Sequence, residues 1–130
     1  MMRSIDLTDT LFSAMAVGPR ELVMSFDRAV VVEHPSPPAS GVSRTCRKVE
    51  LKIMQPGLTP LLNHLPSAIT HGRIVLRDAE YFDAIPLPLV HLGATEFVCR
   101  TVDGERIRVT GSGAVVVFLN GEAAPGPVAH

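Results

Sequence analysis

Hydrophobic and polar residues alternate along much of this chain with the two-residue period of a β-strand. The clearest stretch is 46–54, in which every second residue from Val49 to Ile53 is aliphatic and the residues between them are charged. Such alternation places one side of a strand on a core and the other in water. A longer alternating stretch spans 21–34, where we expect one bent strand or two. The dominant period therefore predicts antiparallel β-structure.

The last third of the chain, 94–121, contains three short apolar runs separated by Asp103-Gly104 and by Gly111-Ser112-Gly113. Turn residues between apolar runs are typical of strands joined by hairpins, so we expect an antiparallel meander with a turn at each of these segments. The final run, 114–119, is apolar on both faces. We expect it to form a central strand that another sheet or a neighbouring subunit covers on each side.

The register of the first of these hairpins follows from its side chains. A two-residue turn at Asp103-Gly104 would place Phe97 on the same face as Arg106, whereas a three-residue loop aligns Phe97 with Val109. The longer loop needs Gly104 in the left-handed conformation, which glycine adopts without steric cost. We therefore expect the three-residue loop.

Two segments carry helix signals. Near 8–17, Leu11, Phe12 and Met15 approximate one helical face, and a Gly-Pro pair follows. Near 60–65, a proline stands at a first helical position after a threonine that can cap it. We expect a short helix in each place, the second one covering an open end of the sheets.

The stretch 72–85 alternates less cleanly. Strict alternation would place Asp78 and Glu80 in one row with Ile74. One extra residue near Asp78, a β-bulge, would turn both carboxylates to solvent and restore an apolar face. We expect a single bulged strand.

Strands separated by turn signals about every ten residues predict an all-β fold, an antiparallel β-sandwich or small barrel of about seven to eight strands. A chain of 130 residues has the size of one domain. We assign residues 1–122 to a single globular β domain. Residues 123–130, which are small and proline-rich, are expected to form a flexible C-terminal tail.

Composition and short segments of the sequence indicate the cellular compartment of the protein. The longest apolar runs are too short for a membrane span of about 20 residues, and Asp6 and Asp9 precede the apolar stretch near the N-terminus, which argues against an export signal. Cys46 and Cys99 both fall in expected strands, where they suit small buried hydrophobic residues better than a disulfide. We therefore expect a cytoplasmic protein without a membrane partner.

The balance of charge argues against a general anion-binding surface and leaves a local one open. The chain has 12 basic and 13 acidic residues and no tryptophan, which argues against nucleic acid as a partner. The expected hairpin register, however, places Arg100, Arg106 and Arg108 together on its outer face. Guanidinium groups there could hold a phosphate, a carboxylate or an acidic partner. The alternative is a solvated face whose arginines pair with acidic neighbours.

Three histidines lie in expected connections. His64, His71 and His91 could meet at one end of the fold and ligate a metal, although they lack the short spacing of a ligand pair. The alternative is that they are separate loop or cap residues. The segment Gly111-Ser112-Gly113 precedes an expected strand and not a helix, so it lacks the geometry of a phosphate loop. No cofactor is expected.

The sequence leaves three functional hypotheses open. The first is a non-catalytic binding or assembly module, which self-associates as a homo-oligomer or binds a protein partner through its apolar last strand and the proline-rich edge at 86–92. The second is a small barrel that binds an apolar ligand. The third is a small enzyme that depends on a metal or on acid/base residues. No motif names a substrate.

Overall fold

The computed structural model describes residues 2–36, 41–57 and 64–119. Within these ranges the chain is all-β, with eight strands and no helix. In chain order the strands are β1 (Met2–Val17), β2 (Glu21–His34), β3 (Ser43–Met54), β4 (Ser67–Leu76), β5 (Ala79–Phe82), β6 (Ala84–Leu87), β7 (Val90–Thr101) and β8 (Arg106–Phe118). The all-β prediction is confirmed.

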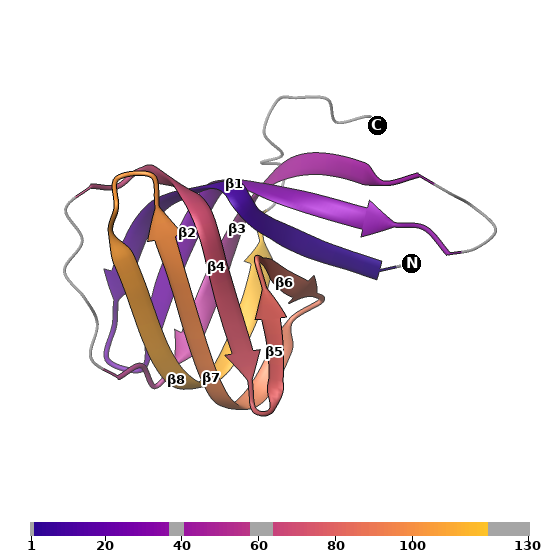
Figure 1. The fold of residues 1–130 in the computed structure, drawn as a ribbon. Helices are drawn as coiled ribbons and strands as arrows, with labels where there is room; N and C mark the ends of the chain where they lie inside the picture. The colour runs from indigo at the N-terminus through magenta and orange to yellow at the C-terminus, as the bar shows by residue number, and fades with distance from the viewer. Residues whose placement is uncertain (1, 37–40, 58–63, 120–130) are drawn as a thin grey trace.

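The strands form one antiparallel sheet in the order β5-β4-β7-β8-β3-β2-β1-β6. A further pairing between β4 and β1 closes six of them into a barrel and leaves β5 and β6 outside it. The fold is therefore a barrel and not a sandwich. In Figure 1 the barrel stands at the left, while the start of β1 and the hairpin between β2 and β3 extend beyond it to the right.

Inward-facing aliphatic and aromatic side chains fill the barrel. Phe12, Phe26 and Phe97 are the largest of them, and all three are almost fully buried. The rings of Phe12 and Phe26 lie 5.4 Å apart. Because even a barrel of about eight strands is narrow enough for side chains to fill, the interior of this smaller barrel is a packed core.

The helix expected near 8–17 is wrong, because these residues form most of β1. The register of β1 against β2 shifts at several places between Asp6 and Ala14, so extra residues bulge out of the strand. Thr10 holds the first bulge. Its hydroxyl donates to the carbonyl of Asp6 at 2.6 Å and accepts the N–H of Val30 at 3.1 Å.

Two other expectations fall on residues that the structure does not describe. The second expected helix, near 60–65, lies mainly on such residues, and the described His64 and Leu65 are not helical. The expected tail at 123–130 lies wholly outside the described ranges. Within those ranges, no helix is long and apolar enough to cross a membrane.

The bulge expected near Asp78 is a turn instead. β4 and β5 form a hairpin in which Leu76 pairs with Ala79, and Arg77 in the turn has a φ of 58°. The hairpin still places Glu80 outward, where its carboxylate forms an ion pair. The apolar and acidic positions are thus separated by a reversal of the chain and not by an extra residue within one strand.

The turn expected at Gly111-Ser112-Gly113 is also wrong, because β8 runs through this segment without a break. The strand pairs with β7 from Arg106 to Val115 and with β3 from Gly113 to Phe118. A β-carbon on Gly111 would collide with the carbonyl oxygen of Met54, so only glycine permits the close approach of the two strands. The glycines therefore let one long strand bend around the barrel.

The predicted register of the hairpin between β7 and β8 is confirmed. Phe97 pairs with Val109, and the Thr101 N–H donates to the carbonyl of Glu105 at 3.0 Å across a three-residue loop. Gly104 in that loop has a φ of 87°. This register decides which side chains share the outer face of the barrel.

Candidate functional site

The outer face of β4, β7 and β8 carries three basic side chains in one row. Arg100 in β7 pairs with His71 in β4 on one side and with Arg106 in β8 on the other, so the three lie abreast on neighbouring strands. His71 continues the alternation of β4 from Arg73 and so lies on the outer face, and the register of β4 against β7 shifts only beyond it, at Thr70. The Thr70 hydroxyl donates to the Arg100 carbonyl at 3.0 Å. We name His71, Arg100 and Arg106 the cationic row.

In the next row along the same face, the basic side chains form ion pairs with acidic ones. It contains Arg73, Val98 and Arg108. Glu96 lies 3.5 Å from Arg73 and accepts a hydrogen bond from Arg108, and Glu80 lies 3.1 Å from Arg73. Arg108 therefore belongs to an ion-pair network on a solvated surface, which is what the alternative interpretation of the arginines expected.

The cationic row has no such network. Among the described residues, no acidic side chain forms an ion pair with His71, Arg100 or Arg106. Arg100 and Arg106 are direct cross-strand neighbours, and like charges in that position destabilise a sheet. A bound anion would offset this repulsion, because it can accept hydrogen bonds from both guanidinium groups.

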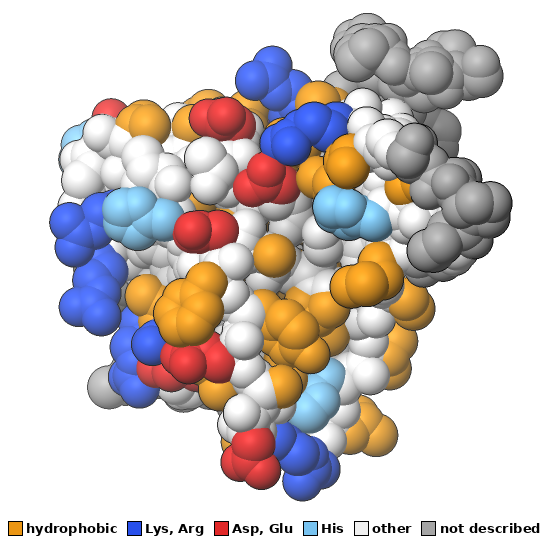
Figure 2. Space-filling view, turned by 45° about the vertical axis from the view of Figure 1, so that its right-hand side comes forward, with side chains coloured by type: hydrophobic (Ala, Val, Ile, Leu, Met, Phe, Trp, Pro, Cys, Tyr) orange, Lys and Arg blue, Asp and Glu red, His pale blue; other side chains and the backbone are white. Residues whose placement is uncertain are grey.

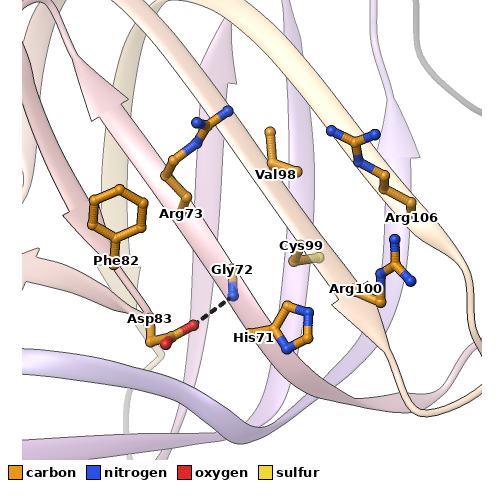
Figure 3. Close-up of a pocket in the computed structure, with 9 residues that line it drawn as sticks. All are labelled: His71, Gly72, Arg73, Phe82, Asp83, Val98, Cys99, Arg100 and Arg106. Carbon is orange, nitrogen blue, oxygen red and sulfur yellow. Dashed lines mark hydrogen bonds between the residues drawn. The ribbon is translucent and has the colours of Figure 1, made fainter.

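The cationic row borders a hollow of about 420 Å³, shown in Figure 3. Gly72 lies at its centre, with Phe82 and Asp83 on one side and Arg100 and Arg106 on the other. The hollow therefore has one aromatic wall and one basic wall.

The aromatic wall comes from β5, which lies outside the barrel. Tyr81 is 37% exposed and Phe82 67%. Figure 2 is turned toward the side where β5 and β6 lie in Figure 1, and it shows hydrophobic side chains among charged ones across the lower half of that face. An exposed ring beside basic groups can pack against the planar or apolar part of a ligand.

Asp83 is the acidic residue of the hollow, and it is bound to the backbone of β4. Its Oδ1 accepts the Gly72 N–H at 2.9 Å, while its own N–H donates to the Gly72 carbonyl at 2.7 Å. These two hydrogen bonds fasten the connection between β5 and β6 to β4 and hold Phe82 beside the hollow. Asp83 thus supports the wall that faces the two arginines.

Gly72, at the centre of the hollow, is the cross-strand neighbour of the buried Cys99. A β-carbon on Gly72 would lie 2.9 Å from the Val98 carbonyl oxygen and 3.2 Å from the β-carbon of Cys99. Burial raises the pKa of the Cys99 thiol to about 12. The thiol therefore stays protonated at neutral pH and is a packed core group, not a nucleophile.

The structure does not bring together the three histidines that were candidate metal ligands. His71 lies on the outer face next to Arg100, whereas His91 lies at the other end of β7, where it pairs with Ala114. His64 lies 3.6 Å from Glu105. Among the described residues, no three His, Cys, Asp or Glu side chains form a group that could hold a metal ion. Only His71 belongs to the candidate site.

Sequence reasoning found two residues of the cationic row and missed the third. Arg100 and Arg106 follow from the hairpin register, but His71 joins them through the pairing of β4 with β7, which the sequence did not predict. The alternation of His71 and Arg73 around a glycine was a signal that both share one face. The position of Phe82 beside the hollow could not be predicted, because a bulge was expected where the chain turns and places β5 beside β4.

Comparison of the chain with models of protein families, with curated proteins and with solved structures found no match.

Proposed function

We propose that this protein is a non-catalytic binding module that holds an anionic group of its ligand, a phosphate or a carboxylate, at the cationic row. The observation that carries the proposal is the alignment of His71, Arg100 and Arg106 on three adjacent strands without an acidic partner among the described residues. Exposed charges on a sheet are more stable in opposite pairs, as in the neighbouring row.

The spacing of the cationic row favours a compact anion with several oxygens. Adjacent strands lie about 4.8 Å apart, so the row spans roughly 10 Å and presents two guanidinium groups side by side. Each guanidinium can donate two parallel hydrogen bonds to one oxyanion, and His71 can donate one more. A phosphate ester offers about three strong acceptor oxygens and can use more of these donors than a carboxylate can. We therefore expect phosphate-bearing ligands to bind more tightly than carboxylates.

The shape of the hollow suits a small phosphate-bearing group. Its volume of about 420 Å³ falls within the usual range of ligand pockets, about 300–1,000 Å³. Phe82 on the opposite wall offers an exposed ring to the part of the ligand that carries the phosphate. The two walls together would orient such a ligand across Gly72.

The hypotheses of an enclosed apolar ligand and of an enzyme have less support. The inward side chains of the barrel pack against one another in a single core cluster. The Cys99 thiol is protonated at neutral pH, and His71 in β4 lies beside the end of β7, whereas His91 lies near its start. Each of these observations favours a binding surface over an internal or catalytic site.

Titration with inorganic pyrophosphate tests the proposal, with calorimetry for affinity and backbone amide NMR shifts for location. We expect saturable binding at low ionic strength and the largest shifts at His71, Arg100 and Arg106. Arg100→Gln and Arg106→Gln should each weaken binding at least about tenfold, because a hydrogen bond to a charged group contributes about 1.5–3 kcal/mol. Acetate should bind more weakly than pyrophosphate.

Arg108→Gln is the matched control. Arg108 lies on the same strand and face as Arg106, but Glu96 holds its guanidinium. The variant removes the same charge and should change pyrophosphate affinity by less than about twofold. Absence of saturable binding, or equal losses in Arg106→Gln and Arg108→Gln, would contradict the proposal.

A further inference from the structure

The hollow beside the cationic row has walls of opposite charge. Arg100 and Arg106 form one wall, and the carboxylate of Asp83 stands at the other, next to Phe82. Asp83 is exposed, and its Oδ1 accepts the Gly72 N–H at 2.9 Å. Its Oδ2 accepts no hydrogen bond from the described residues. A ligand that fills the hollow must therefore bring negative charge to the arginines and hydrogen-bond donors to Asp83.

The strand register sets the distance between the aromatic and the basic wall. Phe82 in β5 pairs with Arg73 in β4, and Arg100 in β7 pairs with His71, two residues earlier in β4. Two strand spacings and two residues thus separate the Cα atoms of Phe82 and Arg100, a distance of about 12 Å. The straight path between them crosses β4 at Gly72. A ligand that contacts both walls must be long enough to lie across Gly72.

Three kinds of group follow one another along this path: the ring of Phe82, the carboxylate of Asp83 at Gly72, and the guanidinium groups. The exposed ring offers a flat face to a planar group. The carboxylate accepts hydrogen bonds, which hydroxyl groups donate. The matching ligand has a planar ring at one end, hydroxyl groups in its middle and phosphate at the other end.

We propose that the cationic row and its hollow bind a nucleoside diphosphate, an inference that rests on the proposed function. The base packs on Phe82, and the ribose hydroxyls donate to Asp83. The two phosphates lie at Arg100 and Arg106. This orientation keeps the phosphates away from the carboxylate, which would repel them if the ligand were reversed.

The length of the path favours two phosphates over one. About eight bonds separate the base from the terminal phosphorus of a nucleoside diphosphate, and an extended chain advances about 1.2 Å per bond, so the two lie about 10 Å apart. A monophosphate is about 2.4 Å shorter. Arg106 lies one strand farther from Phe82 than Arg100 does. The second phosphate therefore brings the anion to both guanidinium groups, whereas a monophosphate is held mainly by Arg100.

Other phosphate-bearing ligands leave part of the hollow without a contact. Pyrophosphate contacts the arginines alone. A phosphate ester of a plain hydrocarbon covers Phe82 but offers Asp83 no donor, and a sugar phosphate offers donors but no planar group. Pockets gain orientation and specificity when each of their few polar groups is matched. A nucleoside diphosphate matches all three kinds of group.

Calorimetric titration with adenosine diphosphate (ADP), adenosine monophosphate (AMP) and pyrophosphate, without divalent cations, tests the inference. ADP should bind at least about tenfold more tightly than pyrophosphate, because a base stacked on an aromatic side chain adds affinity. AMP should bind at least about tenfold more weakly than ADP, because it loses charge-assisted hydrogen bonds.

Phe82→Leu should remove the advantage of ADP over pyrophosphate and change pyrophosphate affinity by less than about twofold. Phe82 is 67% exposed, so the variant should fold as the unaltered chain does. Tyr81→Leu is the matched control. Tyr81 is the neighbouring aromatic residue of β5, but it pairs with the buried Ile74 and so faces away from the hollow. This variant should bind ADP within about twofold of the unaltered chain.

Asp83→Asn provides a second, independent test. An asparagine keeps an oxygen that accepts the Gly72 N–H, but it replaces the free carboxylate oxygen with an amide donor. ADP should bind at least about threefold more weakly to this variant, because the ribose loses its acceptor. Pyrophosphate should bind equally or more tightly, because a nearby negative charge is removed.

The results separate this inference from the proposed function. ADP that binds no more tightly than pyrophosphate, or that keeps its advantage in Phe82→Leu, would overturn the inference, while saturable binding of pyrophosphate at the arginines would still support the proposed function. Equal losses of ADP affinity in Phe82→Leu and Tyr81→Leu would also overturn it. Absence of binding by both ADP and pyrophosphate would overturn both proposals.

Discussion

Replacing Arg106 with glutamate should stabilise the fold and abolish anion binding at the same time. Arg106 and Arg100 are direct cross-strand neighbours on the outer face. Two exposed like charges about 6–8 Å apart repel each other by about 0.5–0.7 kcal/mol in water, and an opposite pair attracts by a similar amount. Arg106→Glu should therefore raise the free energy of unfolding by about 1 kcal/mol and the melting temperature by about 3–5 °C.

Thermal and urea unfolding at two salt concentrations provide the assay. Salt screens exposed charges over about 8 Å at physiological ionic strength. The gain in stability should therefore be largest near about 20 mM salt and almost absent near about 500 mM. Pyrophosphate should raise the melting temperature of the unaltered chain by mass action and leave that of Arg106→Glu unchanged. Arg108→Glu should lower stability, since it replaces the ion pair with Glu96 by two carboxylates.

Two results would refute this reasoning. A loss of stability in Arg106→Glu, or a gain that salt does not reduce, would show that repulsion between Arg100 and Arg106 is not a feature of the fold. A melting temperature of Arg106→Glu that still rises with pyrophosphate would instead refute the assigned binding site.

Three further predictions concern the core and the bends of the barrel. Gly111→Ala should lower the free energy of unfolding by at least about 2 kcal/mol in urea titrations, because its β-carbon collides with Met54. A loss below about 0.5 kcal/mol would contradict the close approach of β8 and β3. Phe97→Ala should cost about 3–5 kcal/mol in the same assay, and Phe97→Leu clearly less, because the ring fills the barrel interior. Burial raises the pKa of Cys99 from an ordinary 9.0 to about 12. Between these two values the folded chain keeps a proton that the unfolded chain loses. The free energy of unfolding should therefore fall as pH rises from about 9 toward 12. Cys99→Val should remove about 2 kcal/mol of that fall at roughly pH 10.5, and an equal alkaline loss in both proteins would contradict the burial of the thiol.

The parts of the fold that could be predicted are those whose pairing is regular and local. The alternation within 46–54 identified β3 because the outward positions 48, 50 and 52 are charged and the inward positions between them are aliphatic. The register between β7 and β8 could be predicted because a shift by one residue would expose Phe97 and bury Arg106. Both inferences needed only the side-chain period and one turn.

β1 could not be predicted because its bulges change the side-chain period. Leu7, Phe12 and Met15 all face the core, and they are spaced three to five residues apart because extra residues loop out between them. That spacing imitates the period of about 3.6 residues of a helix. The contact that holds the first bulge is made by Thr10 with the backbone of Val30 on another strand, so nothing in the local sequence reveals it.

Whether a glycine marks a turn or lies within a strand could not be predicted for the same reason. Gly104 turns the chain between β7 and β8, whereas Gly111 allows a neighbouring strand to approach within an unbroken β8. The difference depends on Met54, which is distant in sequence. His71 was likewise missed as a member of the cationic row, since its place beside Arg100 depends on the long-range pairing of β4 with β7.

The closure of the barrel has a consequence for how fast this chain reaches its native state. β1, β2 and β3 pair with their sequence neighbours, and so do β7 and β8, whereas β1 pairs with β4 at Leu11 and Phe12, and β3 pairs with β8 from Val49 to Met54. Joining residues so far apart in sequence requires a large loss of chain entropy before any contact is gained. The hairpins can form within about 1–10 µs, but a β-barrel rich in distant pairings folds in about milliseconds to seconds. We therefore expect formation of these two distant junctions, β1 with β4 and β3 with β8, to set the folding rate of the whole molecule.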